Sequence, residues 1–401
     1  MSKLEELIQQ YCPDGVEYYK IKDVYRRIKG TPITAGKMKE IATPDGSVRI
    51  FAGGKTVIDA NEKDIPNANI TRVPAVLVQS RGVIDAVYYD KPFTFKNEMW
   101  AYTTFNQKSV KYLYYILKSN IQTFRDAASG MGSLPQISLG VTEEFEIPVP
   151  PLPVQEEIVR ILDNFTELQA ELQAELQKRK QQYNYYLDNL LSFNRGGDQA
   201  EVRWMKLKDV ATQWYRGAGI KREEVSEEGM PCIRYGEIHT TYNIWFDDCI
   251  SHTDESKQAS RKYADKGDIL FAITSEDIPF IGNSVAYLGD ERILVGGDIV
   301  VMKHNQDPKY IAYALSTSDA IKQKGKGKVK SKVVHTNVPS LQEIVIPIPS
   351  MTEQKRIAGI LDRFDRLTND LTAGLPAEIE KRRQQYEYYR DKLLTFKRKE
   401  V

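Results

Sequence analysis

The chain has 401 residues, of which 41% are hydrophobic and 28% charged, and its net charge is +1. This length predicts two or three domains with ordinary cores. No apolar run approaches the roughly 18–20 residues needed to span a bilayer, and the N-terminus lacks the order of a secretory signal, so we expect no membrane contact. The three cysteines are scattered, which argues against a disulfide framework or a zinc site and favours a cytoplasmic protein.

The first part of the chain predicts a short helix followed by a β-rich domain. Residues 1–15 carry leucine and isoleucine at helical spacing. From residue 16 to 152, apolar runs such as Pro74-Ala-Val-Leu-Val78 alternate with Gly, Pro, Asn and Asp, which is typical of strands joined by turns. One helix is expected inside this domain, around Val110–Lys118.

A long helix is predicted over residues 153–195, because apolar residues follow one another in a single stripe at helical spacing. If continuous from Val154 to Phe193, it is about 60 Å long. Within it, Gln169-Ala-Glu-Leu172 is repeated as Gln173-Ala-Glu-Leu176, and each unit adds about 6 Å of rise. We interpret the helix as a spacer whose length can change in whole units. The alternative is low-complexity drift on a solvated helix.

The second half of the chain repeats this order. Residues 196–349 predict a linker and a second β-rich domain, with a strand in Gly267-Asp-Ile-Leu-Phe-Ala-Ile273 and a helix around Tyr310–Ser316. Residues 350–401 predict a second long amphipathic helix, which the segment Gly374–Pro376 should break or kink.

The two halves are copies of one plan. Val16-Glu-Tyr-Tyr-Lys-Ile-Lys-Asp-Val24 reappears as Val202-Arg-Trp-Met-Lys-Leu-Lys-Asp-Val210, and Lys178-Arg-Lys-Gln-Gln-Tyr-Asn-Tyr-Tyr186 as Lys381-Arg-Arg-Gln-Gln-Tyr-Glu-Tyr-Tyr389. Two matching apolar stripes pack most simply as an antiparallel coiled coil within the chain, although a zipper between two chains is the alternative. We therefore predict an α+β fold: two similar mixed α/β domains separated by two long antiparallel coiled-coil helices. The short N-terminal helix docks beside the C-terminal one, which makes the repeat circular and pseudo-two-fold.

Motifs for catalysis are missing from the sequence. There is no G-x-x-x-x-G-K-[ST] phosphate loop, and no glycine-rich dinucleotide motif follows a strand. Asp307-Pro-Lys-Tyr310 is the nearest match to a methyltransferase tetrad, but it has Lys where a second Pro is needed and is explained as a helix N-cap. The four histidines show no ligand spacing. We expect a non-catalytic chain that binds no metal and no cofactor.

Basic and amide side chains suggest DNA binding, although a net charge of +1 requires that the positive charge be concentrated locally. The most basic segment, Lys322-Gln-Lys-Gly-Lys-Gly-Lys-Val-Lys-Ser-Lys332, predicts a flexible loop that follows phosphates, and the alternative is a merely solvated loop. The corresponding stretch of the first half, Arg125–Ser133, is also glycine-rich and polar. Base edges are read by Arg, Lys, Gln and Ser or Thr on a rigid edge. As a group, the candidate DNA-binding residues are Arg49, Lys55, Gln79, Arg81, Arg216, Lys221, Arg222, Arg234, Tyr235, Thr274, Ser275, Lys324, Lys326, Lys328 and Lys330.

Several motifs recur in doubled order. They are Lys20-Ile-Lys-Asp-Val24 and Lys206-Leu-Lys-Asp-Val210, the exits Ile147-Pro-Val-Pro-Pro-Leu-Pro153 and Ile346-Pro-Ile-Pro349, then Gln155-Glu-Glu-Ile158 and Glu353-Gln-Lys-Arg-Ile357. The second domain adds Lys266-Gly-Asp-Ile-Leu270. On these motifs the chain resembles the specificity subunit of type I restriction–modification systems over essentially its full length. The first domain departs from the pattern, with Val73-Pro-Ala-Val where the second has Lys266-Gly-Asp-Ile.

The resemblance implies two target recognition domains, each reading one half of a split, asymmetric sequence in double-stranded DNA. It implies two methyltransferase (modification) subunits that dock on the helices and bind S-adenosylmethionine, and restriction subunits that add ATP-driven translocation and cleavage in defence against phage. This chain itself would hold no cofactor. The alternative interpretation of the residues is a coiled-coil scaffold that joins two protein partners without recognising DNA.

Overall fold

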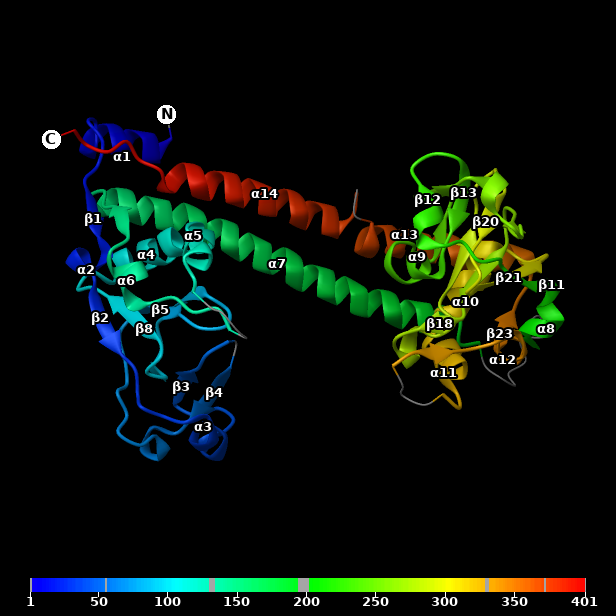
Figure 1. Cartoon of the computed structure of the whole chain (residues 1–401), viewed down its shortest axis with the longest axis horizontal. Helices are drawn as coiled ribbons and strands as arrows, with labels where there is room; N and C mark the ends of the chain where they lie inside the picture. The colour runs from blue at the N-terminus through cyan, green and yellow to red at the C-terminus, as the bar shows by residue number, and fades with distance from the viewer. Residues whose placement is uncertain are drawn as a thin grey trace. The chain divides into compact units, whose positions relative to one another are not determined.

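In the computed structural model of the chain, residues 2–54, 56–129, 134–193, 202–328, 332–370 and 373–400 are described. The chain divides into two compact units. Unit 1 comprises residues 1–171 and 380–401, and unit 2 comprises residues 172–379 (Figure 1). Both divisions fall within the long helical segments, so each unit combines one β-rich domain with parts of both segments. Two candidate residues, Lys55 and Lys330, lie outside the described residues.

Unit 1 begins with a short helix and contains three small sheets, of two, three and four strands. Its strands are β1 (Tyr18–Lys20), β2 (Arg26–Lys29), β3 (Val48–Phe51), β4 (Val57–Ala60), β5 (Ala75–Gln79), β6 (Asp85–Tyr89), β7 (Phe93–Phe95), β8 (Trp100–Thr103) and β9 (Glu146–Pro148). Its helices are α1 (Lys3–Tyr11), α2 (Ile21–Val24), α3 (Ala35–Ile41), η1 (Glu62–Asp64), α4 (Gln107–Ser119), α5 (Ile121–Asp126), α6 (Leu139–Glu143) and the start of α7 (Leu152–Leu190).

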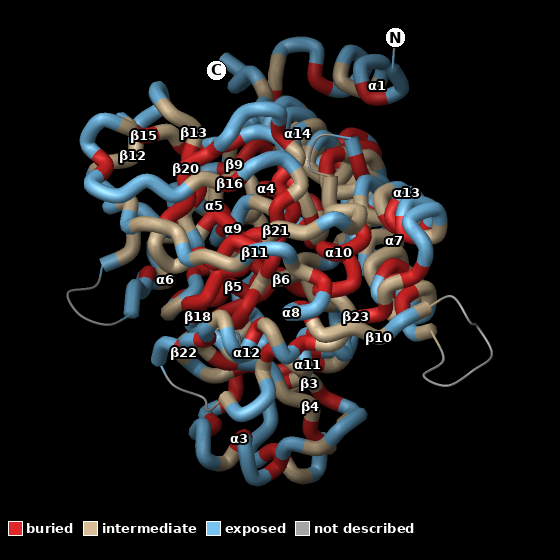
Figure 2. Tube along the Cα trace, turned by 90° about the vertical axis from the view of Figure 1, so that its right-hand side faces the viewer, coloured by how far each residue is buried: buried red, intermediate tan, exposed pale blue. Residues whose placement is uncertain are grey.

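The larger sheet of unit 1 has the strand order β2-β8-β5-β6 and is antiparallel throughout. Strand β5 is buried over its whole length, since α4 covers one face of it (Figure 2). The smaller sheet has the order β4-β3-β7, with β3 and β7 parallel. Strand β1 pairs with β9, which brings the opening of the domain beside its proline-rich exit.

The two ends of the chain meet in unit 1. Leu4 of α1 and Leu394 belong to one buried cluster. The backbone N–H of Val16 donates to the carbonyl of Lys397 at 2.9 Å, and the N–H of Lys399 donates to the carbonyl of Val16 at 2.9 Å. Early in α7, Phe165 stacks on a ring near the end of the chain, Tyr389, with ring centroids 5.6 Å apart. Through these contacts the N-terminal helix lies near the C-terminal segment, where its docking was predicted.

Unit 2 contains more strands than unit 1. They are β10 (Arg203–Lys206), β11 (Ala211–Arg216), β12 (Val225–Ser226), β13 (Met230–Ile233), β14 (Trp245–Phe246), β15 (Ser251–Thr253), β16 (Tyr263–Ala264), β17 (Ile269–Ala272), β18 (Thr274–Ser275), β19 (Ser284–Tyr287), β20 (Ile293–Val295), β21 (Ile299–His304), β22 (Val334–His335) and β23 (Val345–Ile348). The helices are α8 (Leu207–Val210), η2 (Arg222–Glu224), α9 (Tyr235–Thr240), η3 (Glu255–Lys257), η4 (Ile278–Phe280), α10 (Pro308–Leu315), α11 (Ser318–Gly325), α12 (Val338–Gln342), α13 (Met351–Asn369) and α14 (Leu375–Leu394), whose second part belongs to unit 1.

Two five-stranded sheets form the core of unit 2, with strand orders β11-β21-β17-β19-β14 and β12-β15-β13-β20-β16. Helix α10 packs on β17 and β19, as α4 packs on β5 and β6 in unit 1. The prediction of one helix inside each domain located α4 and α10 but was incomplete, because short helices such as α9 and α11 were not anticipated. These segments are too short to show a helical period in the sequence.

The long helical segments differ in continuity. Helix α7 is unbroken over 39 residues, or about 58 Å. The second segment is interrupted where Gly374 was expected to break it, because α13 ends at Asn369 and α14 begins at Leu375. In unit 2, Tyr186 near the end of α7 stacks on Phe364 of α13, with ring centroids 5.1 Å apart. In the part of the chain that is described, no helix is both long and apolar enough to cross a membrane.

The duplication extends to single hydrogen bonds. The hydroxyl of Tyr112 donates to the carbonyl of Pro148 at 3.2 Å, and the hydroxyl of Tyr310 donates to the carbonyl of Pro347 at 2.9 Å. A carboxylate of the long helical segment then fixes the same helix in each unit. Asp163 accepts from Lys111 at 2.8 Å and Tyr115 at 2.5 Å, and Asp362 accepts from Lys309 at 2.5 Å, Tyr313 at 2.8 Å and Trp245 at 3.1 Å. The predicted α+β fold with two similar domains is confirmed.

Candidate nucleic-acid interface

Strand β3 of unit 1 and strand β13 of unit 2 end in the same way, because the last residue of each accepts one further backbone hydrogen bond. In unit 1 the N–H of Lys96 donates to the carbonyl of Phe51, the last residue of β3, at 3.0 Å. In unit 2 the N–H of Gly296 donates to the carbonyl of Ile233, the last residue of β13, at 2.9 Å. Because both strands also run parallel to their partners, residues 52–54 of unit 1 correspond to residues 234–236 of unit 2.

A second pair of strands ends nearby. The N–H of Ile137 donates to the carbonyl of Ser80 at 3.0 Å, and the N–H of Thr336 donates to the carbonyl of Ile273 at 2.9 Å. Residues 81–82 of unit 1 therefore correspond to residues 274–275 of unit 2. We call these paired segments the strand-end edge: 52–54 with 81–82 in unit 1, and 234–236 with 274–275 in unit 2.

The strand-end edge of unit 2 lies between two cavities. The first has a volume of about 850 Å³ and is lined by Arg216, Gly217, Gly219, Ile220, Arg222, Arg234, Tyr235, Gly236, Glu237, Thr240, Gly296, Gly297 and Asp298. The second has a volume of about 440 Å³ and is lined by Tyr235, Gly236, His239, Thr240, Thr274, Ser275, Glu276, Asp277, Phe280 and Val333. Tyr235, Gly236 and Thr240 line both, so the cavities adjoin. Six of the candidates, Arg216, Arg222, Arg234, Tyr235, Thr274 and Ser275, are brought together here, and exposed Lys221 precedes Arg222.

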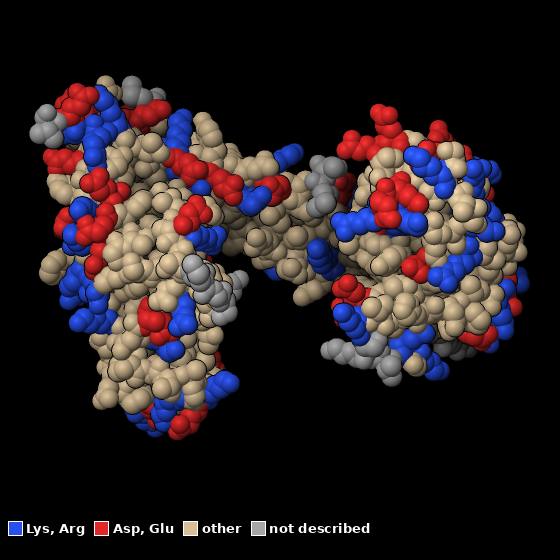
Figure 3. Space-filling view, in the orientation of Figure 1, with Lys and Arg blue, Asp and Glu red and all other residues tan. Residues whose placement is uncertain are grey.

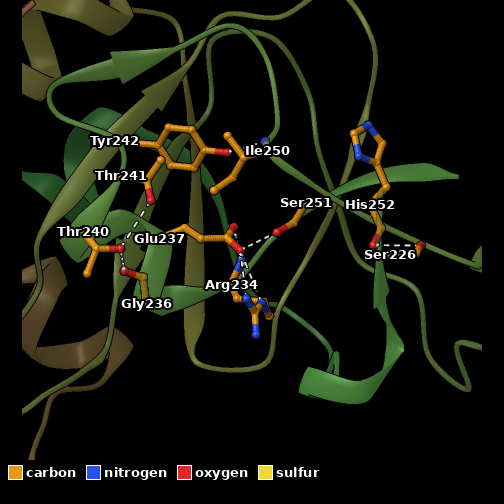
Figure 4. A network of polar contacts seen from close by, with 10 residues as sticks. All are labelled: Ser226, Arg234, Gly236, Glu237, Thr240, Thr241, Tyr242, Ile250, Ser251 and His252. Atoms are coloured by element: carbon orange, nitrogen blue, oxygen red, sulfur yellow. Dashed lines mark hydrogen bonds and ion pairs between the residues drawn. The ribbon is translucent and has the colours of Figure 1, made fainter. Parts of the chain in front are cut away.

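A buried carboxylate positions one of the arginines. Arg234 Nε and Nη2 donate to Glu237 Oε1 at 3.3 and 3.2 Å. The same oxygen accepts from Ser251 Oγ at 2.7 Å, while Oε2 accepts from the backbone N–H of Arg234 at 3.1 Å. Figure 4 shows the carboxylate between Arg234 and Ser251. The side chain of Glu237 is 7% exposed and that of Arg234 is 33% exposed, so the carboxylate is shielded while the guanidinium reaches the cavity.

The other two arginines of the first cavity are held differently. Arg216 Nη2 forms an exposed ion pair with Asp298 at 2.8 Å, and its Nε donates to the carbonyl of Gly297. Arg222 is exposed and forms no ion pair with any described residue. The wall near Arg216 is bare backbone, since a Cβ on Gly217 would lie 2.2 Å from the carbonyl oxygen of Gly296. Only glycine permits this close crossing.

The strand-end edge of unit 1 is built mainly from glycine backbone. Gly54 and Gly82 have φ of +72° and +77°, a region that favours glycine. The N–H of Gly54 donates to the carbonyl of Arg81 at 3.2 Å, and buried Gln79 donates through Nε2 to the carbonyl of Gly54 at 3.0 Å. Arg81 is exposed and forms no ion pair with a described residue. Gln79 therefore supports the edge, and Arg81 is its free cation among the described residues.

Arg49 is already engaged by another side chain. Its guanidinium donates through Nε and Nη2 to Asp59 at 2.9 and 3.0 Å, and it lies 5.5 Å from the centroid of the Tyr89 ring. The carboxylate of Asp59 raises the pKa of Arg49, and the pKa of Asp59 is lowered in turn. Arg49 stays a candidate DNA-binding residue, but reading a base would require it to release this partner.

The lysine-rich segment is not one flexible loop. Its first part is helix α11, which ends at Gly325. Lys324 is 7% exposed and its ammonium donates to Ser284 Oγ at 3.3 Å, so it does not face solvent as a phosphate-binding loop requires. Burial lowers the pKa of Lys324 to about 7. Lys326 is exposed and Lys328 is half-buried, so these two stay candidates, whereas residues 329–331 and 130–133 lie outside the described part.

Charge is finely mixed over the surface. On the face drawn in Figure 3, lysine and arginine lie beside aspartate and glutamate in both units, and no broad surface of one sign appears there. The arginines that line the first cavity of unit 2 are instead a local concentration around the strand-end edge. Among the described residues, no group of three or more His, Cys, Asp or Glu side chains is placed to hold a metal ion.

Neither Glu237 nor the glycines that line the first cavity were predicted from the sequence as site residues. Glu237 follows Arg234 by three residues, the spacing at which side chains meet on one turn of a helix, and this was the available signal. The approach of Gly217 to Gly296 could not be inferred, because it joins residues far apart in the chain. The equivalence of Arg81 and Thr274 also depends on sheet register, which one sequence does not reveal.

Two copies of one mixed domain, each with a polar strand-end edge and each joined to the long helices, define a protein built by internal duplication. Both halves match a family model described as the type I restriction modification DNA specificity domain, over residues 13–179 and 200–381. The chain belongs to this family of type I restriction–modification specificity subunits.

Individual relatives agree with this assignment. A type I restriction enzyme specificity subunit of Escherichia coli is 35% identical over 305 residues, which are 74% of this chain and 73% of that one. A putative type I restriction enzyme specificity subunit of Haemophilus influenzae is 32% identical over 263 residues, 63% of this chain and 64% of its own length. The crystal structure of a type I restriction–modification S subunit from M. genitalium has the same fold, with a TM-score of 0.59 and 17% identity over 95% of this chain and 96% of that one.

Proposed function

We propose that this chain selects the DNA target of a type I restriction–modification complex, and that each unit reads one half of a split duplex sequence at its strand-end edge. The observation that carries the proposal is that corresponding edges hold different side chains, Arg81 in unit 1 against Arg234 and Tyr235 in unit 2. Arginine and amide groups on a rigid edge suit base reading, and different groups suit different half-sites.

The chemistry would come from partner subunits. Two methyltransferase subunits would bind S-adenosylmethionine, and restriction subunits would use ATP, while this chain has no catalytic role. Duplicated exposed aromatics on the long helices support paired docking sites: Tyr185 of α7 is 65% exposed, and Tyr388 of α14 is 62% exposed. Each lies against a neighbouring tyrosine ring, Tyr186 or Tyr389. Exposed aromatics are enriched where proteins associate.

Helix α7 would set the gap between the half-sites. Deletion of Gln173-Ala-Glu-Leu176 shortens it by about 6 Å. We expect the variant to recognise the same two half-sites with a shorter gap. A folded variant that keeps the original gap contradicts the spacer role without affecting half-site recognition.

The proposal is tested by mapping methylated DNA in cells that contain the methyltransferase subunit with or without this chain. We expect methylation at one split sequence only when the chain is present, and no methyl transfer by the purified chain alone. Binding of the chain with its methyltransferase subunits to a mixed-sequence duplex should also weaken steeply as salt rises, because phosphate contacts release counterions. A chain that assembles with protein partners but leaves methylation unchanged and shows no salt-dependent DNA binding would instead be the coiled-coil scaffold.

A further inference from the structure

We infer that Arg234 is the residue with which unit 2 reads a guanine, and that Glu237 is a positioning residue that holds its guanidinium for this contact. The inference rests on the proposed function and deepens it, because it assigns one base and one side chain. It predicts that the half-site of unit 2 contains a G·C base pair, and that replacing this pair weakens DNA binding only when Arg234 is present.

The hydrogen bonds fix which edge of the guanidinium is available. Glu237 Oε1 accepts from Nε and Nη2 of Arg234, so one side of the fork faces the buried carboxylate. The edge formed by Nη1 and the second N–H of Nη2 has no partner among the described residues. Two parallel N–H groups on a planar cation match the O6 and N7 acceptors that guanine presents in the major groove.

The carboxylate is itself immobilised. Glu237 lies in the first turn of α9 and is held by the hydroxyl of Ser251 and by the backbone N–H of Arg234. Its side chain is shielded from solvent, whereas that of Arg234 is one-third exposed in the larger cavity. An arginine whose orientation is set before binding loses less side-chain entropy on contact with a base.

The surroundings of Arg234 favour a base over a phosphate. Gly219 and Gly236 line the same cavity, and a Cβ on either would meet no atom within 4 Å, so an incoming group can approach the backbone there. The neighbouring ring of Tyr235 is 39% exposed and offers an apolar surface beside the fork. Arg222, exposed and without an ion-pair partner among the described residues, is better placed for a phosphate and provides the matched control.

The first experiment uses the wild-type chain assembled with its methyltransferase subunits, so it does not depend on the folding of a variant. Each guanine of the mapped target is replaced in turn by 7-deazaguanine, which lacks the N7 acceptor. We expect one position in one half-site to weaken binding about tenfold through loss of a hydrogen bond to a charged donor. That position should be the one at which replacing G·C by A·T weakens binding about 5- to 150-fold.

The second experiment asks whether Arg234 makes this contact. In Arg234→Gln, neither 7-deazaguanine nor the replacement of G·C by A·T should weaken binding further at that position. Base discrimination at the other positions should be retained. Glu237→Gln keeps an acceptor oxygen but removes the charge, so it should reduce discrimination at the same position by a smaller factor. Arg222→Gln should weaken binding equally for all sequences and lower the salt dependence by about one phosphate contact. Thermal unfolding of each variant identifies any that fail to fold, for which Arg234→Lys is substituted.

The outcomes separate this inference from the proposed function. A wild-type complex that binds every altered duplex equally contradicts the proposed function itself. A complex that discriminates normally but keeps full discrimination at every guanine in Arg234→Gln overturns the assignment of Arg234. So does a mapped target in which the half-site unaffected by changes at Arg81 contains no G·C pair. If Glu237→Gln relaxes a different position from Arg234→Gln, Glu237 does not act through Arg234.

Discussion

The strand-end edges of the two units have the same backbone and different side chains. In each unit a parallel strand and a central strand end side by side, with matching backbone hydrogen bonds. Unit 1 presents Gly53, Gly54 and Arg81 there, and unit 2 presents Arg234, Tyr235 and Thr274. Beneath them, the hydrogen bonds from a helix tyrosine to a proline carbonyl of the exit strand are present in both units.

On the proposed function, support and recognition are carried by separate residues. The duplicated hydrogen bonds of the scaffold lie between helices and exits, whereas the edge residues lie in loops that follow strands. Loops on a rigid support can change without loss of the fold. Experiments that damage the scaffold should therefore affect both units in related ways, whereas changes at an edge should affect one half-site only.

The largest effect is expected where the duplicated carboxylates anchor the helices. Asp362 accepts hydrogen bonds from three side chains and Asp163 from two, and the side chain of Asp362 is less exposed, at 16% against 24%. Asp362→Ala should lower the free energy of unfolding of unit 2 by about 2–4 kcal/mol, because it leaves buried donors without an acceptor. Asp163→Ala should cost unit 1 about 1–2 kcal/mol. Denaturant unfolding of both variants measures this, and equal losses would contradict the ranking.

A pH-dependent effect is expected in unit 2 through Lys324. Its pKa in the folded chain is about 7, below the ordinary value of 10.5, because burial disfavours the ammonium. Between these values the unfolded chain binds a proton that the folded chain does not, so stability should rise with pH from 7 to about 10, by at most about 1.4 kcal/mol per pH unit.

Lys324→Met should remove this pH dependence and stabilise unit 2 at pH 7. Lys322→Met, at an exposed position of the same helix, is the control and should leave the dependence intact. The corresponding helix of unit 1, α5, buries Phe124, which has no ionisable group, so it should not make the stability of unit 1 depend on pH. If the free energy of unfolding of Lys324→Met still rises with pH as in the wild type, another group is responsible.

A smaller effect, confined to recognition, is expected at the edge of unit 1. Arg81→Gln should reduce base discrimination by about 1–2 kcal/mol at one position of one half-site. Thr274→Val, at the corresponding position of unit 2, should alter only the other half-site, because Thr274 lines a cavity formed by unit 2 alone. Methylation mapping of both variants tests this separation, and a change in both half-sites from either variant would reject it.

The smallest effect is expected for the duplicated exposed ion pairs. Lys20 and Lys22 hold the pKa of Glu144 at about 2, and Lys206 with Lys208 lowers the pKa of Glu343. Because the pKa of each carboxylate is lowered in the folded chain, its ion pairs should stabilise the fold above pH 4.5 and stop doing so as the pH falls. All these side chains are exposed, however, so solvent screens the ion pairs. Glu144→Gln and Glu343→Gln should therefore both leave the midpoint of thermal unfolding unchanged at neutral pH. A clear shift in one alone would show that the two exits are not equivalent.

The sequence was sufficient for the large features of the fold. The repeated motifs identified the duplication, the helical period located α7, and Gly374 with Pro376 predicted the break before Leu375. The site was only partly predictable: six residues of unit 2 do gather at two adjoining cavities, but Lys324 was wrongly assigned to a loop. Alternating lysines gave no sign that one of them packs inward, because that depends on tertiary contacts. The role of Glu237, in α9, similarly depends on a contact with Ser251 of strand β15.

The pairing of Val16 with Lys397 and Lys399 has a consequence for how the protein is made. Unit 2 is one uninterrupted stretch, residues 172–379, whereas unit 1 requires residues 380–401 as well. A domain synthesised first usually folds first. Here unit 1 cannot be completed until residues 380–401 have been synthesised, so α1 and Val16 lack these partners while unit 2 is being made. A chain released before residue 380 would contain a complete unit 2 and an open unit 1, a state that chaperones and proteases can recognise.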